Sequence, residues 1–138
     1  MKSDEIKFTI ETPPRTKKNH QQIGYNRRTG KPFIRQSDAY KAYEAAVMML
    51  VPAWARQHID YPVNIKAIYY MDTRRRVDRV NLEEALNDAL VRAGVIADDN
   101  CTIAATADGS RVLYDKIHPR IEVTITRLEA DDAEKSML

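Results

Sequence analysis

Two segments far apart in the chain alternate apolar and polar side chains with a period of two. Residues 119–128 read PRIEVTITRL, and residues 5–11 read EIKFTIE. This alternation is typical of strands that bury one face and expose the other to solvent. A sheet built from such strands needs a second layer over its apolar face. The sequence therefore favours an architecture in which helices cover one side of a sheet.

Two helical patterns can supply that layer. The first runs from residue 38 to about 55–57; Ser37 is its expected N-cap, and Pro52 is expected to kink it or split off its last turn. The second covers residues 79–93 and carries an apolar stripe at helical spacing. The stripe consists of Leu82, Leu86, Ala89, Leu90 and Ala93.

The remaining segments complete the expected fold. Residues 62–71 and 101–107 are predicted strands, and the segment GYNRRTGKPFI is a predicted hairpin with its tip at Arg27–Lys31 and Gly30 as the turn residue. The prediction is an α+β fold, with a mixed four-stranded sheet and two helices packed on one face. The expected element order is β-(hairpin)-α-β-α-β-β.

Length and composition indicate a single domain. A chain of 138 residues suits one domain, expected here over residues 1–128 with an acidic tail at 129–138. No run of about 18 apolar residues is present, so no membrane span is expected. Charges occupy the place where a signal peptide needs an apolar core, and the expected location is the cytoplasm. Cys101 is the single cysteine, which excludes an internal disulfide.

Positive charge is concentrated at the start of the chain. Residues 1–36 hold nine Lys or Arg and three acids, a balance of +6. Such a segment suits a polyanionic partner, although a solvated surface with ordinary lysines explains the same charge. The candidate nucleic-acid contacts in this segment are Lys17, Lys18, Asn19, Arg27, Arg28 and Lys31.

A second candidate region combines arginines with aspartates. Arg74–Arg76 precede Asp78 at the start of the second helix, which is expected to end before Gly94. A short apolar strand over residues 95–97 could then bring Asp98 and Asp99 back towards the sheet. Mg²⁺ takes hard oxygen ligands, usually one or two carboxylates with water and substrate phosphate, and two aspartates from separate segments meet that demand.

A plainer interpretation fits the same aspartates. Asp78 can act only as the helix N-cap, and residues 98–100 can form only a turn before the next strand. Neither feature has the fixed spacing of a metal motif. Spacing alone therefore leaves both interpretations open.

The stretch from residue 74 to 99 resembles RusA-like Holliday junction resolvases, which are endodeoxyribonucleases often encoded by prophages. The family pattern is a basic run, Asp-x-Asp-Asn-Leu opening a helix, then Asp-Ala-Leu, Gly and Asp-Asp. The residues in register are Asp78, Asn81, Leu82, Asp88-Ala89-Leu90, Gly94 and Asp98-Asp99. The early segment PPRTKKNHQ is similar to the family's Pro-Pro loop, and the strand order agrees from about residue 5 to 127.

This resemblance implies Mg²⁺-dependent cleavage of four-way DNA junctions in recombination and repair, with Mn²⁺ as a possible substitute ion. It implies that Asp78 and Asp99 are metal ligands with Asp98 close by. It also implies that Arg74–Arg76 contact phosphates, and Asn81 is a further expected DNA contact. The implied active form is a homodimer, since a junction with approximate two-fold symmetry needs two identical sites. Trp54, near Pro52, is a candidate interface residue that core packing explains equally well.

Two positions depart from the family pattern. The second aspartate of the helix-opening motif is Val80 here, and a lysine one turn later is Glu84. Val80 cannot bind a metal, whereas Glu84 is a candidate replacement acid, so Asp78, Asp98, Asp99 and Glu84 are the candidate catalytic residues. The alternative is a catalytically impaired protein that binds DNA junctions on the same fold. A third hypothesis is an interaction domain whose acids only cap helices.

Overall fold

The computed structural model describes residues 5–17, 21–36 and 38–129, and its main layer is a mixed five-stranded sheet. Strand β7 lies between β1 and β4 and is antiparallel to both, while β5 and β6 pair with β4 in parallel. The predicted α+β class is confirmed, with one strand more than the four expected. The strands are β1 (Glu5–Ile10), β4 (Val63–Met71), β5 (Ala104–Thr106), β6 (Arg111–Tyr114) and β7 (Arg120–Arg127).

The two period-two segments form β1 and β7, which pair with each other, with β1 at the edge of the sheet and β7 inside it. Alternate side chains of β1 and β7 are buried and the residues between them are not. The apolar residues lie opposite one another on one face, where they are covered. The paired residues are Ile6 with Ile125, Phe8 with Val123 and Ile10 with Ile121.

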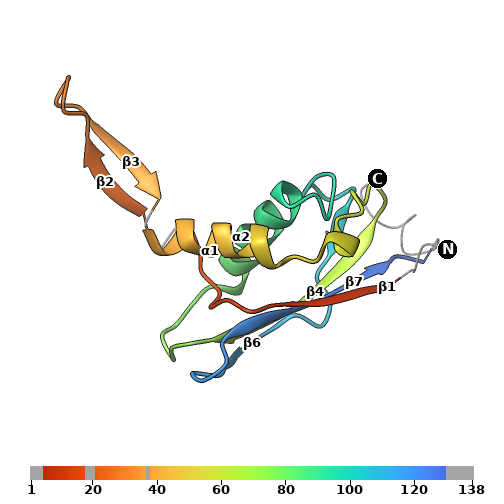
Figure 1. The fold of residues 1–138 in the computed structure, drawn as a ribbon. Coiled ribbons are helices and arrows are strands. Elements are labelled where there is room, and N and C mark those ends of the chain that lie inside the picture. The colour runs from red at the N-terminus through yellow and green to blue at the C-terminus, as the bar shows by residue number, and fades with distance from the viewer. Residues whose placement is uncertain (1–4, 18–20, 37, 130–138) are drawn as a thin grey trace.

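Helices α1 (Asp38–Leu50) and α2 (Arg79–Arg92) lie together on one side of the sheet, as Figure 1 shows. Each buries the stripe that its sequence spacing predicts. From α1 the buried residues are Tyr40, Tyr43 and Val47, and from α2 they are Leu82, Ala85, Leu86, Ala89 and Leu90. No described helix is long and apolar enough to cross a membrane.

The last turn of the first helix is split off at Pro52, which is one of the two outcomes that the sequence predicts. α1 stops at Leu50, and a separate 3-10 turn, η2 (Ala53–Ala55), follows Pro52. Proline has no N–H to donate to the preceding turn, which explains why the helix breaks there. The predicted cap, Ser37, lies outside the described residues.

Both ends of α2 follow the sequence prediction. The Asp78 carboxylate accepts a hydrogen bond from the Val80 backbone N–H at 2.9 Å, which makes Asp78 the N-cap. Gly94 has φ +77° just beyond the C-cap, Ala93. A left-handed residue at this position favours glycine, as predicted.

The segment after α2 contains less strand than expected. Residues 95–97 contribute only a single bridge, between Ile96 and Ile59. The predicted strand at 101–107 is shortened to β5, because the backbone amides of Ile103 and Ala104 donate to the Asn100 carbonyl and close a turn. β6 was not among the strands that the sequence predicted.

Strands β2 (Gln21–Tyr25) and β3 (Pro32–Gln36) form a hairpin of their own that projects from the body of the molecule (Figure 1). Its turn is closed by a hydrogen bond from Asn26 N to Lys31 O at 2.9 Å, and Gly30 adopts φ +70°. The predicted hairpin and its turn glycine are therefore confirmed. The proposed acidic tail, from residue 130 on, lies outside the described residues.

Candidate functional site

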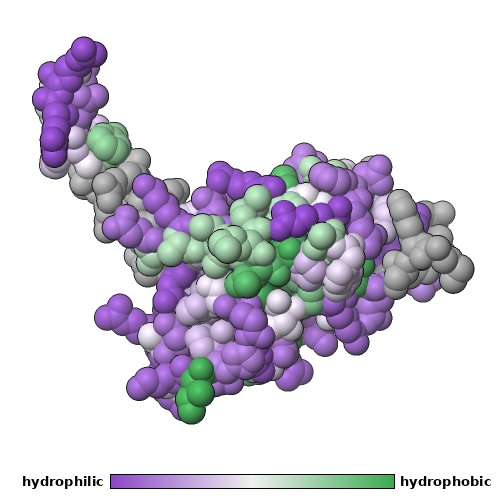
Figure 2. Space-filling view, viewed as in Figure 1, coloured by the Kyte–Doolittle hydropathy of each residue, from purple (hydrophilic) through white to green (hydrophobic). Residues whose placement is uncertain are grey.

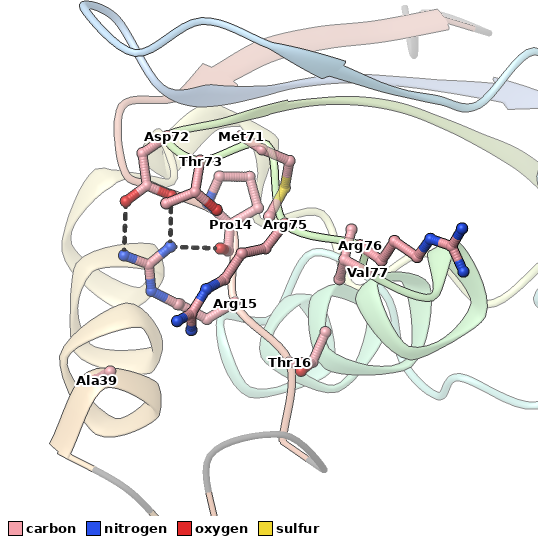
Figure 3. A pocket seen from close by; sticks show the side chains of 10 residues that line it. All are labelled: Pro14, Arg15, Thr16, Ala39, Met71, Asp72, Thr73, Arg75, Arg76 and Val77. Carbon is pink, nitrogen blue, oxygen red and sulfur yellow. Dashed lines mark hydrogen bonds and ion pairs between the residues drawn. The ribbon is translucent and has the colours of Figure 1, made fainter.

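The loop between β4 and α2 carries three arginines, Arg74–Arg76, and all three are exposed. The Arg74 guanidinium lies over the ring of Tyr114, 4.1 Å from its centroid. This stacking gives Arg74 a fixed position beside β6. Both Arg75 and Arg76 line a neighbouring pocket, and Figure 3 shows the Arg75 side chain pointing toward Arg15 while the Arg76 side chain points away from the other lining residues.

That pocket has a volume of about 470 Å³ and lies between the early loop, the start of α1 and the end of β4. Its size falls in the range of ordinary ligand sites. Apolar walls come from Pro14, Ala39, Met71 and Val77. The pocket therefore combines a hydrophobic lining with cationic side chains.

An ion pair holds one side of the pocket together. Arg15 donates to both carboxylate oxygens of Asp72, at 2.8 and 3.0 Å (Figure 3). The Arg15 guanidinium keeps the pKa of Asp72 below its ordinary value. Thr16, also in the lining, is buried, and its hydroxyl has no hydrogen-bond partner among the described residues. Arg15, Thr16 and Asp72 were not predicted as site residues, and the one available signal was an aspartate directly after a strand.

The start of α2 exposes the first predicted metal ligand. Asp78 is exposed, and Val80, two residues later, has 59% of its surface exposed. Asn81 is partly buried and Glu84 is exposed on the same helix. The hydrogen bond that caps α2 is accepted by Oδ1 of Asp78 and does not involve Oδ2.

Lys17 is paired within the molecule. Its ammonium group forms an ion pair with the Asp88 carboxylate and lies 5.8 Å from the centroid of the Tyr40 ring. Both members of the pair are partly buried, so this lysine holds the early loop against α2. Lys18 and Asn19, the neighbouring predicted DNA contacts, lie outside the described residues.

A second acidic group follows α2. Asp98 and Asp99 are exposed, and Asp98 accepts a hydrogen bond from the backbone N–H of Asp99 at 2.7 Å. Burial raises the pKa of Asp99, and the side chain of Asp98 and the charge of Asp88 raise it further. Crowded carboxylates of this kind are relieved by a bound cation, so their chemistry fits a hard divalent ion.

The two predicted metal ligands are set apart by α2. Asp78 caps its start, and Asp88, whose charge acts on Asp99, lies ten residues later, about 15 Å along a helix axis. Within residues 5–17, 21–36 and 38–129, no group of three or more His, Cys, Asp or Glu side chains is placed to hold a metal ion. The sharing of one ion by Asp78 and Asp99 stays a prediction.

The hairpin tip carries the remaining predicted contacts. Arg27, Arg28 and Lys31 are all exposed there. The Asn26 side chain accepts a hydrogen bond from the Arg28 N–H at 2.8 Å, which orders the turn. Three cations thus lie at the end of a projecting arm.

Comparison with known families explains why arginines and aspartates occur together. The model of the family described as endodeoxyribonuclease RusA matches residues 10–126. The chain belongs to the RusA family. RusA enzymes are endodeoxyribonucleases and are generally dependent on a divalent metal. A search of curated proteins found no match to this RusA chain.

Proposed function

We propose that this chain is a structure-selective endonuclease that cleaves branched DNA, in particular four-way junctions, in recombination and repair. The match to the RusA family over residues 10–126 is the observation that carries this proposal. The exposed arginines of the loop from β4 to α2 lie beside the exposed Asp78, so phosphate-binding and acidic groups are neighbours in the sequence and on the surface.

The proposed DNA contacts are cationic and polar groups. Arg74–Arg76 and the hairpin tip are exposed and can meet phosphates, which position a protein without reading sequence. Asn81 lies one turn into α2 behind the arginines. The full proposed set is Lys18, Asn19, Arg27, Arg28, Lys31, Arg74, Arg75, Arg76 and Asn81. Lys17 is left out of this set because its ammonium group is paired with Asp88.

The proposed metal ligands are Asp78 and Asp99, with Mg²⁺ as the ion and Mn²⁺ as a substitute. When bound, such an ion lowers the pKa of a coordinated water and stabilises charge on phosphate oxygens. Asp98 holds the backbone of Asp99 in place, and Glu84 is the proposed additional acid on α2. Because the pKa of Asp99 is raised, protonation removes this ligand at a higher pH than for an ordinary aspartate.

The separation of Asp78 from Asp99 gives the metal assignment a direct test. Calcium binding is measured by calorimetry on the wild type, Asp78→Asn, Asp99→Asn and the control Asp60→Asn, an exposed aspartate outside the proposed site. If both site variants lose the same ion, the two carboxylates share it. If only Asp99→Asn loses binding, Asp78 is a helix cap and not a ligand.

The activity is tested by incubating the chain with a synthetic four-way junction and with linear duplex, in Mg²⁺ and in EDTA. We expect cutting of the junction in Mg²⁺ by the wild type and Asp60→Asn, but not by Asp99→Asn. Binding without cutting by the wild type would support the alternative, a catalytically impaired junction-binding protein. In that case, Val80→Asp with Glu84→Lys restores the family pattern and should restore cutting. Weak binding of the junction that does not depend on salt would instead support the third hypothesis, an interaction domain whose acids only cap helices.

We also propose that the active form is a homodimer. Apolar side chains are exposed where α1 ends, and Figure 2 shows them as a green patch over this helix. Met49 is 84% and Trp54 is 58% exposed, although Trp54 also meets the Phe8 ring edge-on. Contiguous apolar surface of this kind often marks an interface. Sedimentation should show a dimer that Met49→Ser with Trp54→Ser converts to a monomer.

A further inference from the structure

The turn between β6 and β7 presents an isolated apolar side chain to solvent. Ile117 is 96% exposed, more than any other large hydrophobic residue in the described part of the chain. Leu113 and Tyr114, on the strand that leads into the turn, are also exposed. Figure 2 shows a green knob at the lower end of the molecule, where Figure 1 places this turn.

The turn is held in one shape by hydrogen bonds. The Asp115 carboxylate accepts from the His118 backbone N–H and from Arg120, each at 3.0 Å. Arg120 also donates to the His118 carbonyl at 2.9 Å and stacks over the Tyr70 ring. The backbone hydrogen bond from His118 and the Arg120 guanidinium hold the pKa of Asp115 below its usual range. The backbone on both sides of Ile117 is therefore fixed although its side chain touches little.

The same turn is anchored beside the arginine loop. The Asp115 backbone N–H donates to the Met71 carbonyl at 2.9 Å, and Tyr114 pairs with Met71 in the parallel ladder. Arg74 stacks on Tyr114, 4.1 Å from the ring centroid. Ile117 thus projects from the edge of the sheet that also carries the proposed phosphate contacts.

An apolar residue on a rigid turn next to cations suits one kind of DNA contact. Proteins that kink or open DNA insert Phe, Leu, Ile, Met or Pro between base steps, while nearby cations hold the backbone. Disturbing a base is easiest where pairing is already broken, as at a branch point. We propose that Ile117 is a wedge that enters the branch point of the DNA and unstacks the adjacent base pair. This role rests on the proposed action on branched DNA.

The wedge is tested with a four-way junction that carries 2-aminopurine at a branch-point pair, in EDTA so that no strand is cut. The fluorescence of this base rises when it leaves the stack. We expect a severalfold rise on binding of the wild type and of Ile117→Phe, and no rise with Ile117→Ser. Lys116→Ser is the matched control, because it removes a charge from the same turn and leaves the wedge, so it should behave as the wild type. Binding by Ile117→Ser should weaken by about tenfold, the order of effect expected when the burial of one Ile side chain is lost.

The outcomes separate the wedge from the function on which it rests. Equal fluorescence rises with the wild type and Ile117→Ser, or no rise with either while both bind, overturn the wedge and leave the nuclease proposal standing. Absence of junction binding by the wild type in a mobility-shift assay overturns both. A change of oligomeric state in Ile117→Ser with an unchanged fluorescence rise identifies the turn as a protein contact and also overturns the wedge. Because Ile117 is exposed, the folding of its variants is checked simply by circular dichroism.

Discussion

Asp72 and Asp99 are the same type of residue, yet their surroundings shift their pKa values in opposite directions. Two hydrogen bonds from Arg15 lower the pKa of Asp72, whereas burial and neighbouring acids raise that of Asp99. A lowered pKa marks a carboxylate whose partner is already within the chain. A raised pKa marks a carboxylate whose ionised form is disfavoured by its surroundings, and a bound cation would relieve this effect.

The Arg15–Asp72 pair predicts a pH-dependent contribution to stability. Because the folded-state pKa of Asp72 is depressed, its contribution is present above the unfolded pKa near 3.8 and is lost as the pH falls through the folded value. Asp72→Asn should lower the free energy of unfolding by roughly 1 kcal/mol at pH 7 and by less at pH 3. Urea unfolding at both pH values measures this, with Asp60→Asn as the control; an equal loss at both would contradict it.

Asp99→Asn should act in the opposite sense on stability. The folded-state pKa of Asp99 is raised, so its ionised form destabilises the fold at neutral pH, and the effect disappears as the pH falls through the folded and then the unfolded pKa. We therefore expect the variant to melt at the same temperature as the wild type or higher at pH 7. It should lose junction cutting and keep or improve junction binding, because a negative charge near DNA is removed. Loss of the folded circular dichroism spectrum would make Asp99 structural.

Among single residues, the sequence predicted those whose roles depend on neighbours close by in the chain. Asp78 as a cap and Gly94 as a left-handed residue each follow from neighbours within one helical turn. Arg15 and Asp72 are 57 positions apart, and their pairing depends on how β4 and the early loop come together. No local pattern records such a pair, so this part of the pocket was missed.

The helices and the hairpin were predictable as elements because each has its own periodicity or turn residue. β6 was not, since its side chains are mostly exposed and show no apolar alternation. This strand exists because its backbone continues the parallel ladder along β4, from Ile68–Arg111 to Met71–Tyr114. A strand that depends on pairing with a distant strand has only a weak pattern in its own sequence.

The end of α2 supplies a prediction about the stability of an element. In Gly94→Ala, a left-handed alanine costs about 1–2 kcal/mol. The new Cβ would also lie 2.8 Å from His58 Cε1, so the ring must shift. Gly30→Ala is the control, because it has a similar φ but meets nothing within 4 Å, in a hairpin outside the main sheet. Thermal unfolding should show a clear loss for the first variant and little change in the main transition for the second.

In the described part of the molecule, the arginine loop and the hairpin tip each expose a group of three cations. The net charge is only +2, so binding to DNA depends on this distribution and not on the total. The early excess of positive charge indicated nucleic acid, but it could not show that Lys17 is already paired with Asp88. Charge patterning therefore does not tell which lysines are already paired within the chain.

Replacing Arg74, Arg75 and Arg76 with alanine should weaken junction binding at every DNA sequence. Cations that neutralise phosphates release counterions, so the slope of log affinity against log salt should become shallower by about 0.9 for each phosphate that is no longer neutralised. Anisotropy titrations at several salt concentrations measure this slope. The control is Arg111→Ala, an exposed arginine on β6 outside the loop. An unchanged slope in the triple variant would remove these arginines from the DNA-binding surface.

The position of β7 has a consequence for how the protein is made. The last strand of the chain inserts between the first strand, β1, and the central strand, β4. While the ribosome is still translating the preceding residues, both of those strands have an open edge and the sheet cannot close. The arginine loop and the turn that carries Ile117 adjoin strands of this sheet, so we expect them to reach their final places only after β7 has been translated. We therefore expect a chain whose translation stops before β7 to be degraded by proteases and to lack nuclease activity.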